Sequence, residues 1–563
     1  MESKRLILFF VFSFSLFLLL DAWQRDQHPA PAPVARKADS SVKADIAPPP
    51  VPSAPLAAPG TPPQPEAGAV VPKSDVVRVE TDLLRAEISI LGGDLRRLEF
   101  KKHPDRENSE KPFVLFETSP ERTYVAQSGL IGGELPTHRT AYKVDAASYQ
   151  LGANADTVEV TLHAPASGGA KVTKVYRFQR GSYVVDVTHR IENQGQAPLN
   201  PFGYFQLVRD GKPPVGDSKM LPTFTGVAMF TDKDKFQKAT FEDVEKGKQS
   251  FPKTSNDGWI AMLQHYFFSA WLPQNGVQRE FYTRPLQNNL YAAGVIVPVA
   301  TIAPGASATL TVPLYAGPQE QDKLAKLAPG LDLTVDYGWL TILAVPLFSV
   351  LAWFYEWVGN WGVAIILLTV LIKLVFYPLS QAGYRSMAKM RVVAPKLQRL
   401  KEQYGSDRQR MQQAMMELYK TEKINPLGGC FPIMIQIPVF IALYWVILAS
   451  VELRHAPFFG WIQDLSAPDT LFGVIPYLDV PLGLLPILMG ATMIIQTKLN
   501  PEPPDPVQAK VMKIMPVAFS VFFFFFPAGL VLYWLVNNIL SIAQQWHINR
   551  LLERANLAPA RKS

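Results

Sequence analysis

The sequence predicts a polytopic α-helical membrane protein with six spans and a large extracytoplasmic β-sandwich domain. Two observations support this prediction. Residues 73–335 contain alternating apolar and polar runs that are typical of strands, whereas the chain after residue 336 is apolar almost to its end. With 563 residues, of which 48% are hydrophobic and 18% charged, the chain is long enough for two or three domains and too apolar to be disordered throughout.

The composition also excludes several classes of site. A single cysteine, Cys430, cannot form an intramolecular disulfide or a cysteine-based metal cluster. The eight histidines are scattered, and the sequence has no nucleophile elbow and no phosphate-binding loop. We therefore expect no enzyme activity, no cofactor and no metal site.

The chain begins with a membrane anchor and a linker. Lys4 and Arg5 precede an apolar run with no small-x-small cleavage site soon after it, so we interpret residues 1–24 as an uncleaved anchor rather than a signal peptide, with the amino terminus in the cytoplasm. Residues 25–72 are rich in proline and predict an extended linker. A proline-rich ligand for a partner is the alternative interpretation of this segment.

Residues 73–335 are predicted to form the β-sandwich. Period-two runs such as 183–191 and 172–178 are separated by clusters of Gly, Asn and Pro. About 260 residues are ample for a separate core. Because the domain follows the anchor, we expect it outside the cytoplasm.

The positive-inside rule decides which apolar stretches cross the membrane. Residues 380–423 contain ten Lys or Arg against four acidic residues and must be cytoplasmic. Only one of the two preceding apolar stretches can then span. We therefore place residues 336–360 in the outer interface as an amphipathic helix, residues 361–379 as the second span, and residues 380–423 as a cytoplasmic helical hairpin.

The remaining segments alternate across the membrane by the same rule. The run from Ile514 to Trp546 would be about 50 Å long as one helix, too long for a bilayer core of about 30 Å. Pro527 splits it into two arms. The short first arm fits either a thinned bilayer or a helix extended toward the cytoplasm. The segments are the third span (424–451), an external loop (452–479), the fourth span (480–497), a cytoplasmic loop (498–513), the fifth span (514–526), the sixth span (530–546) and a basic cytoplasmic tail (547–563).

A lysine inside the second span is the main candidate for a functional residue. Thr369, Lys373 and Tyr377 recur at a spacing of four and share one helix face. A charge in a span is costly and is tolerated where it faces protein or water. Lys373 would therefore line a hydrated groove, or its side chain would snorkel to the cytoplasmic interface. Polar residues of other spans, which would line the groove or join helices, are Gln436, Ser520, Asn537 and Asn538.

The cytoplasmic segments offer two further candidate contacts. Methionines of the hairpin provide an adaptable apolar surface for varied substrates, or simply pack the two helices together. The basic tail would contact ribosomal RNA or anionic lipid, or only orient the last span. The residues are Met387, Met390, Met411, Met415 and Met416 in the hairpin, and Arg550, Arg554, Arg561 and Lys562 in the tail.

Two long motifs resemble a known family. The stretches Asn-Pro-Leu-Gly-Gly-Cys-Phe-Pro-Ile-Met-Ile-Gln-Ile-Pro at 425–438 and Pro-Ala-Gly-Leu-Val-Leu-Tyr-Trp at 527–534 resemble the YidC/Oxa/Alb family of membrane protein insertases. The resemblance is strong over residues 336–552, and the linker with its large outer domain is similar to the Gram-negative form. It implies a five-span insertase core, an amino-terminal anchor, and a periplasmic super-sandwich for which no sugar-binding motif is present.

The resemblance also implies a site. It predicts a hydrophilic groove within the membrane that is open to cytoplasm and lipid and closed toward the outside. Lys373 stands where the family has an arginine, which keeps the charge but loses the planar, bidentate guanidinium. Other groove or substrate-facing positions are Thr369, Gln436, Tyr533 and Trp534.

The function implied is the insertion, folding and assembly of nascent inner-membrane proteins, alone or with the Sec translocon (SecYEG, SecDF). The ribosome, the signal recognition particle pathway and the lipid bilayer are the other expected partners. A channel or transporter would carry paired charges or internal repeats, and the sequence has neither. A cell-envelope enzyme would need catalytic groups in the outer domain.

Overall fold

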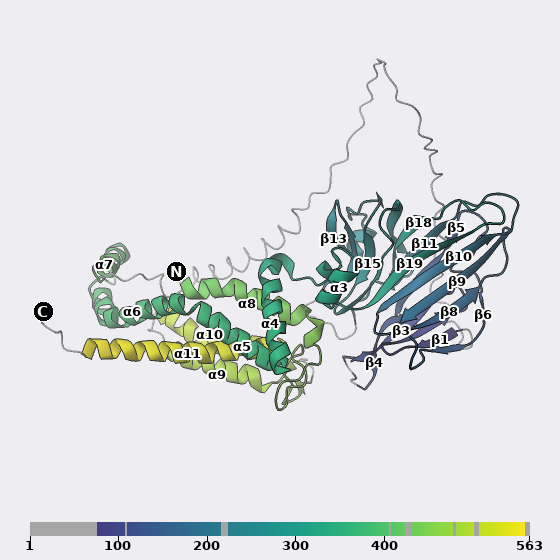
Figure 1. Ribbon diagram of the computed structural model, residues 1–563. Helices are drawn as coiled ribbons and strands as arrows, with labels where there is room; N and C mark the ends of the chain where they lie inside the picture. Colours follow the sequence, from purple (N-terminus) through teal and green to yellow (C-terminus); the bar gives the residue numbers. More distant parts are fainter. Residues whose placement is uncertain are drawn as a thin grey trace, which may run out of the picture. The chain divides into compact units, whose positions relative to one another are not determined.

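The computed structural model describes residues 76–557 except 107, 109, 215–222, 405–406, 423–430, 477–479 and 500–505. The predicted anchor (1–24), the linker (25–72) and the end of the tail lie outside the described residues. The chain divides into a β-rich unit, which ends at Thr334, and a helical unit, which runs from Val335 onward. The expected large β-rich domain is thereby confirmed (Figure 1).

Two antiparallel sheets form the β-rich unit, apart from one parallel pairing of β1 with β7. The first has ten strands in the order β14-β17-β18-β11-β5-β4-β3-β2-β1-β7, and the second has nine in the order β13-β12-β15-β16-β19-β10-β9-β8-β6. The strands of the first are β1 (Val76–Glu80), β2 (Leu84–Ser89), β3 (Leu95–Pro104), β4 (Pro112–Thr118), β5 (Thr123–Ile131), β7 (Ser148–Gln150), β11 (Phe202–Asp210), β14 (Thr254–Ser255), β17 (Arg279–Leu286) and β18 (Leu290–Pro298). Those of the second are β6 (Lys143–Val144), β8 (Thr157–His163), β9 (Ala170–Gln179), β10 (Val184–Asn193), β12 (Gly226–Thr231), β13 (Lys235–Thr240), β15 (Trp259–Leu263), β16 (Phe267–Trp271) and β19 (Ser307–Pro318).

The two sheets pack face to face through large side chains. Along β10 the buried residues alternate with more exposed ones, as a strand with one face on a core requires. Phe205 of the first sheet meets Trp271 of the second with ring centroids 5.1 Å apart. The Tyr124 hydroxyl lies 2.7 Å from the Ser269 hydroxyl and donates to the Met262 carbonyl at 3.1 Å. Short helices, α2 (Phe241–Glu245), α3 (Gln321–Leu327) and η2 (Leu331–Thr334), complete this unit.

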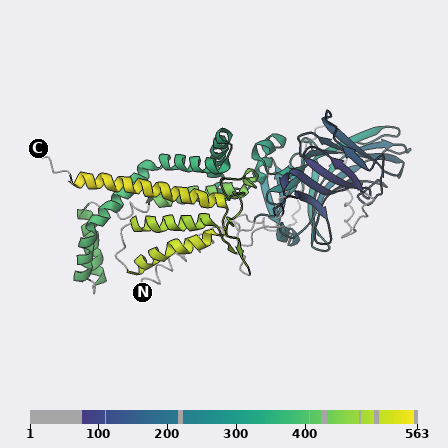
Figure 2. The same cartoon turned by 90° about the horizontal axis from the view of Figure 1, so that it is seen from below.

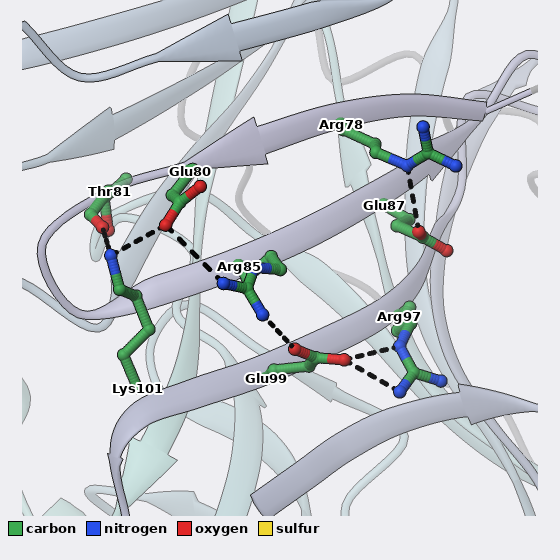
Figure 3. Close-up of polar contacts among 8 residues, drawn as sticks. All are labelled: Arg78, Glu80, Thr81, Arg85, Glu87, Arg97, Glu99 and Lys101. Atoms are coloured by element: carbon green, nitrogen blue, oxygen red, sulfur yellow. Dashed lines mark hydrogen bonds and ion pairs between the residues drawn. The ribbon is translucent and has the colours of Figure 1, made fainter. Parts of the chain in front are cut away.

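The solvent face of β1, β2 and β3 carries charges of alternating sign (Figure 3). Spacing of two along each strand puts these side chains on one face, and the antiparallel register sets acids opposite bases. Exposed pairs of this kind contribute only about 0.2–1 kcal/mol each, so they favour the register more than they stabilise the fold, whereas Glu99 is only 8% exposed and its two pairs are partly buried. The pairs are Arg78 with Glu87 (3.4 Å), Arg85 with Glu80 (3.7 Å) and Glu99 (3.2 Å), Arg97 with Glu99 (2.7 Å), and Lys101 with Glu80 (2.9 Å).

The helical unit contains a bundle of apolar helices with a helical hairpin at one end (Figures 1 and 2). Its main helices are α4 (Thr341–Val358), α5 (Trp361–Val375), α6 (Tyr377–Tyr404), α7 (Arg408–Thr421), α8 (Phe431–Ala449), α9 (Leu484–Leu499), α10 (Pro506–Phe523) and α11 (Ala528–Leu557). Its short elements are η3 (Gly338–Leu340), η5 (Val451–Leu453), β20 (Val474–Ile475) and β21 (Val480–Pro481).

The second predicted span, 361–379, does not continue as one helix. It breaks at Phe376, and α5 meets the first turns of α6 at an angle of 66°. Pro378 lacks the N–H that would donate to the carbonyl of Leu374, which removes a helical hydrogen bond at this point. The hairpin therefore begins at Tyr377, three residues earlier than expected. Its second helix, α7, begins at Arg408, because the Asp407 carboxylate accepts from the backbone N–H groups of Gln409 and Arg410.

Three other helices have bounds that differ from the predicted spans. The segment 480–497 begins as strand β21, and α9 starts only at Leu484, whose neighbour Leu485 donates its N–H to Asp469. The fifth segment extends toward the cytoplasmic loop, since α10 begins at Pro506, where proline suits the first turn. Helix α10 is thus longer at its amino-terminal end than the predicted arm, and the way it fits the bilayer stays a prediction. The last helix passes without a break from Ala528 through the predicted end of the sixth span to Leu557.

The number of spans stays a prediction. In the described part of the chain, Gly338–Val358 is the one helix long and apolar enough to cross a membrane unaided, and the bent pair of α5 with the start of α6 is a second candidate. However, α4 runs across the ends of α5 and α8 rather than alongside them (Figures 1 and 2). The interfacial placement of residues 336–360 stays a prediction.

Two buried tyrosines of the β-rich unit should respond in opposite ways to loss of the hydroxyl. Tyr124 is hydrogen-bonded, whereas the Tyr142 hydroxyl has no hydrogen-bond partner within the described residues although its side chain is only 2% exposed. We expect Tyr124→Phe to lower the free energy of unfolding by about 1–2 kcal/mol and Tyr142→Phe to leave it unchanged or raise it. Urea unfolding of residues 76–334, followed by tryptophan fluorescence, measures both. Equal losses would contradict the assigned hydrogen bonds.

The β-rich unit should lose stability at alkaline pH. Burial raises the pKa of Tyr124 to about 12, and also raises the pKa values of Tyr142, Tyr176, Tyr204 and Tyr315. Above a pH of about 10 the unfolded chain releases these protons while the folded chain retains them, so stability falls as pH rises. Urea midpoints between pH 8 and 11 test this, and Tyr142→Phe should flatten the decline. A midpoint independent of pH would contradict it.

Candidate functional site: a buried lysine between apolar helices

The ammonium of Lys373 lies between two helices. The residue is only 8% exposed, and its Nζ donates a hydrogen bond to Ser541 Oγ on α11 at 2.7 Å. The Ser541 hydroxyl donates its own hydrogen to the carbonyl of Asn537 at 2.7 Å, so its oxygen is free to accept from the lysine. The ammonium is thus held against α11 by the Ser541 hydroxyl.

A third helix takes part in the same cluster. The phenol of Tyr384 on α6 also hydrogen-bonds to the Ser541 side chain. Since α5 and α6 are separated by the break at Phe376, Ser541 connects both sides of that break to α11. The side chain of Gln544, one turn further along α11, donates to the carbonyl of Tyr377 at 3.4 Å.

No acidic group neutralises Lys373 within the part of the chain that the structure describes. Its only described polar partner is Ser541, which occupies one of the three N–H groups of the ammonium. Thr369, one turn away on α5, is 1% exposed and donates its hydroxyl to the carbonyl of Ile365 at 2.6 Å. Its hydroxyl oxygen can still accept. The site is therefore positively charged, and it retains capacity to bind an anionic or hydrated group.

An aromatic cluster surrounds Trp534. Its ring lies edge-on to Phe440 of α8, with centroids 4.5 Å apart, and 5.5 Å from Phe523 of α10. Tyr533 is buried beside Phe440 at 6.3 Å. The indole Nε1 of Trp534 is buried without a hydrogen-bond partner among the described atoms. Gln436 precedes Phe440 by one turn, so both lie on the same face of α8.

Two of the predicted polar residues join helices. Ser520 of α10 donates to the carbonyl of Pro486 on α9 at 2.7 Å. Asn538 of α11 donates to the hydroxyl of Thr492, also on α9, at 3.2 Å. These contacts correspond to the interhelical alternative and not to a shared lining with Lys373. Asn537 contributes through its backbone carbonyl.

The hairpin methionines divide between packing and exposure. Met390 and Met415 pack on Val393 and Leu397 between α6 and α7, which supports the packing alternative for these two. Met416 is 58% exposed, and Met387 and Met411 are partly exposed. In the tail, the Arg550 guanidinium stacks 3.9 Å above the ring of Trp546. Arg561 and Lys562 lie outside the described residues, as does the side chain of Arg554.

The β-rich unit also buries charged side chains. Among them, Asp94 and Lys174 are both 0% exposed, and Lys174 donates to the carbonyls of Gly92 and Ser128 at 3.2 Å. Asp94 accepts from Gln127 at 2.8 Å. A substrate in solution cannot reach this pair. No cluster of three or more His, Cys, Asp or Glu suitable for a metal occurs among the described residues.

Sequence reasoning missed Ser541, Tyr384 and Phe440. Ser541 is a lone hydroxyl in an apolar run, and a pairing between residues 373 and 541 is not visible in either helix alone. The signal available was the spacing of Asn537 and Ser541, which places two polar groups on one face of α11.

A bundle of apolar helices around a buried lysine that no described carboxylate neutralises, together with a separate large β-sandwich, defines a class: integral membrane proteins that handle polar or charged material within the bilayer. Comparison with known proteins identifies the family within this class. Residues 76–350 match the model of the YidC periplasmic domain, and residues 353–555 match the model of the 60Kd inner membrane protein.

Curated relatives match over their whole length. The membrane protein insertase YidC of Nitrosospira multiformis is 54% identical, covering 100% of both chains, and that of Methylobacillus flagellatus is 55% identical, covering 99% of this chain and 98% of the relative. A crystal structure of an active YidC insertase with its first transmembrane domain resolved aligns over 84% of this chain and 92% of that chain, with 18% identity and a TM-score of 0.37. The chain belongs to the YidC family of membrane protein insertases.

The hydrogen bond between Lys373 and Ser541 should be measurable as a stability coupling. Ser541→Ala removes the only described acceptor of a buried ammonium, so we expect a loss of about 1–3 kcal/mol in the free energy of unfolding. Ser541→Thr keeps the hydroxyl and serves as the control. Thermal unfolding of the full chain in detergent provides the measurement.

The same substitution made in a Lys373→Leu background isolates the pair. Without the ammonium, Ser541→Ala should lower the free energy of unfolding markedly less than it does in the wild type. Identical losses in the two backgrounds would mean that Ser541 acts only within α11.

Proposed function

We propose that this chain inserts nascent membrane proteins into the bilayer and assists their folding and assembly. The observation that carries the proposal is the buried ammonium of Lys373, which has no carboxylate partner among the described residues. Family membership and the names of the full-length relatives support it. The reaction needs no nucleotide and no bond cleavage.

The proposed mechanism is electrostatic attraction followed by partitioning. Lys373 attracts the acidic, hydrated segment of a client protein, because a charge in a medium of low dielectric acts more strongly than one in water. The segment then has a shorter apolar distance to cross. Transfer of the client's apolar span from water into lipid supplies the free energy.

The proposed path for the client is a hydrophilic groove open to the cytoplasm and to lipid. The residues that would line it are those with spare hydrogen-bonding capacity near α5, α8 and α11. Lys373 provides the charge and Thr369 a hydroxyl acceptor, while the Trp534 indole offers a donor without a described partner. Gln436 and Tyr533 would complete the lining.

The proposed topology has six spans with both termini in the cytoplasm and the β-rich unit in the periplasm. In this arrangement the anchor (1–24) and linker (25–72) precede the periplasmic domain (73–335). The segment 336–360 lies in the outer interface, which the crosswise course of α4 supports (Figures 1 and 2). The protein would therefore reside in the inner membrane.

The proposed partners contact the cytoplasmic side. Met416, which is exposed on the hairpin, and the neighbouring Met387 and Met411 would receive apolar client segments. Arg550, Arg554, Arg561 and Lys562 would approach ribosomal RNA or anionic lipid. Clients would arrive through the signal recognition particle pathway and the ribosome, and some would be shared with the Sec translocon (SecYEG, SecDF).

Insertion by purified protein in liposomes tests the proposal. A small membrane protein with an acidic outer segment is synthesised in the presence of liposomes that contain wild-type, Lys373→Leu or Lys373→Arg protein, and protease protection reports insertion. We expect Lys373→Leu to lower insertion about tenfold, the equivalent of about 1.4 kcal/mol, and Lys373→Arg to retain it because the charge remains.

A client whose outer segment is made neutral by Asp→Asn and Glu→Gln exchange provides the control. Its insertion should depend little on residue 373. Equal loss for acidic and neutral clients would assign Lys373 a structural role. Absence of insertion by the wild-type protein would refute autonomous insertion.

A further inference from the structure

The loop between α8 and α9, residues 450–483, exposes an unusual number of large apolar side chains. Five of them lie within residues 459–474. In the β-rich unit, the described residues of 76–334 expose only four, namely Leu91, Val277, Leu327 and Leu333. The five of the loop are Phe459 (63% exposed), Trp461 (38%), Leu471 (42%), Phe472 (58%) and Val474 (52%). We call these five residues the apolar edge.

The charged residues of the same segment point inward. Between residues 456 and 476 the sequence has two charges, Asp464 and Asp469. Asp469 is 5% exposed and accepts from the Trp461 indole at 3.1 Å and from the backbone of Leu485 at 2.8 Å. Asp464 accepts from the backbone and hydroxyl of Ser466 at 2.8 and 2.7 Å. A surface that faces water shows the opposite arrangement, with its charged side chains directed outward, as on the face of β1, β2 and β3 in Figure 3.

The loop also satisfies much of its own backbone. The N–H of Leu465 donates to the carbonyl of Ala456 at 3.0 Å, that of Phe472 to Leu482 at 2.9 Å, and that of Leu482 to Gly473 at 2.8 Å. Irregular chain is excluded from a lipid environment mainly by unpaired backbone groups. Internal pairing of this kind permits a loop to sit among lipid headgroups.

The depth of the loop is fixed by the helix ends. The carbonyls of Leu465 and Ala467 accept from the first backbone N–H groups of α11, at Gly529 and Ala528, with distances of 2.9 and 2.7 Å. Phe458 packs against Gly362 in the first turn of α5. The loop therefore stays at the level where α5, α9 and α11 begin.

We propose that the apolar edge is a membrane-binding surface, occupied by phospholipid acyl chains of the leaflet at which the loop emerges. The start of α9, which follows the loop in the chain, also exposes apolar side chains, with Ile487 46% and Leu488 40% exposed. The absence of outward charge between residues 456 and 476 suits lipid, and Trp and Phe are typical of the interfacial zone. The proposal does not depend on the proposed insertase mechanism.

Fluorescence quenching of the full chain in nanodiscs tests the occupant. Single cysteines replace Phe472, Val474 or, as the control, the exposed polar residue Thr470, in a Cys430→Ser background. Each carries an environment-sensitive dye. We expect lipids brominated near the top of the acyl chain to cause about a twofold loss of fluorescence at positions 472 and 474, with iodide in the buffer having little effect. Position 470 should show the reverse.

Two results would overturn the proposal. Quenching by iodide and not by brominated lipid at positions 472 and 474 would place the apolar edge in water. Protection from both quenchers would mean that protein covers it, whether another part of this chain, a second copy or a client. Circular dichroism and the thermal midpoint of each labelled variant confirm that the fold is retained, and agreement between the two test positions excludes a local effect of the dye.

Discussion

A buried lysine between apolar helices, with no carboxylate partner among the described residues, is the constraint on which the helical unit depends. A lysine at mid-membrane costs about 2.5–3.5 kcal/mol on insertion scales, so the surrounding helices must supply acceptors or water. Ser541 supplies one acceptor, and Tyr384 links the same hydroxyl to α6. Helices α5, α6 and α11 are thereby held together at the point where the chain bends. The remaining N–H donors of the ammonium are what this arrangement offers to a polar group that enters the bundle.

The two ends of the helical unit differ in chemistry. At one end lies the hairpin of α6 and α7 (Figure 1), whose sequence is basic and whose methionines are partly exposed. At the other end α4 crosses the bundle, and the α8–α9 loop binds the first turns of α9 and α11 through Asp469 and backbone carbonyls. Aromatic packing around Trp534 lies between these ends. A polar segment that enters from the hairpin end would meet Lys373 within the bundle. Beyond Lys373 it would meet the α8–α9 loop, which is hydrogen-bonded to the first turns of α9 and α11.

The sequence predicted the features that arise from local patterns. It did not predict the features that depend on contacts between residues far apart in the chain. Alternating runs predicted the strands of the β-rich unit. The start of α9 is set by Asp469, which lies 16 residues before Leu485, and no local pattern reveals that contact. The predicted fifth span begins only after Lys510 and Lys513, because the uncharged run begins there. Helix α10 nevertheless includes both lysines. The position of Lys373 was predicted, but its partner Ser541 is 168 residues away.

The most direct test of the account is to ask whether the Lys373 amine touches a client carboxylate during insertion. A zero-length carbodiimide, applied to a ribosome-bound insertion intermediate, joins an amine and a carboxylate only when they are in contact. The account predicts an adduct between Lys373 and an acidic client that disappears with Lys373→Arg, although that variant still inserts the client. An adduct of equal yield in Lys373→Arg, or no adduct with a client that is being inserted, would contradict it.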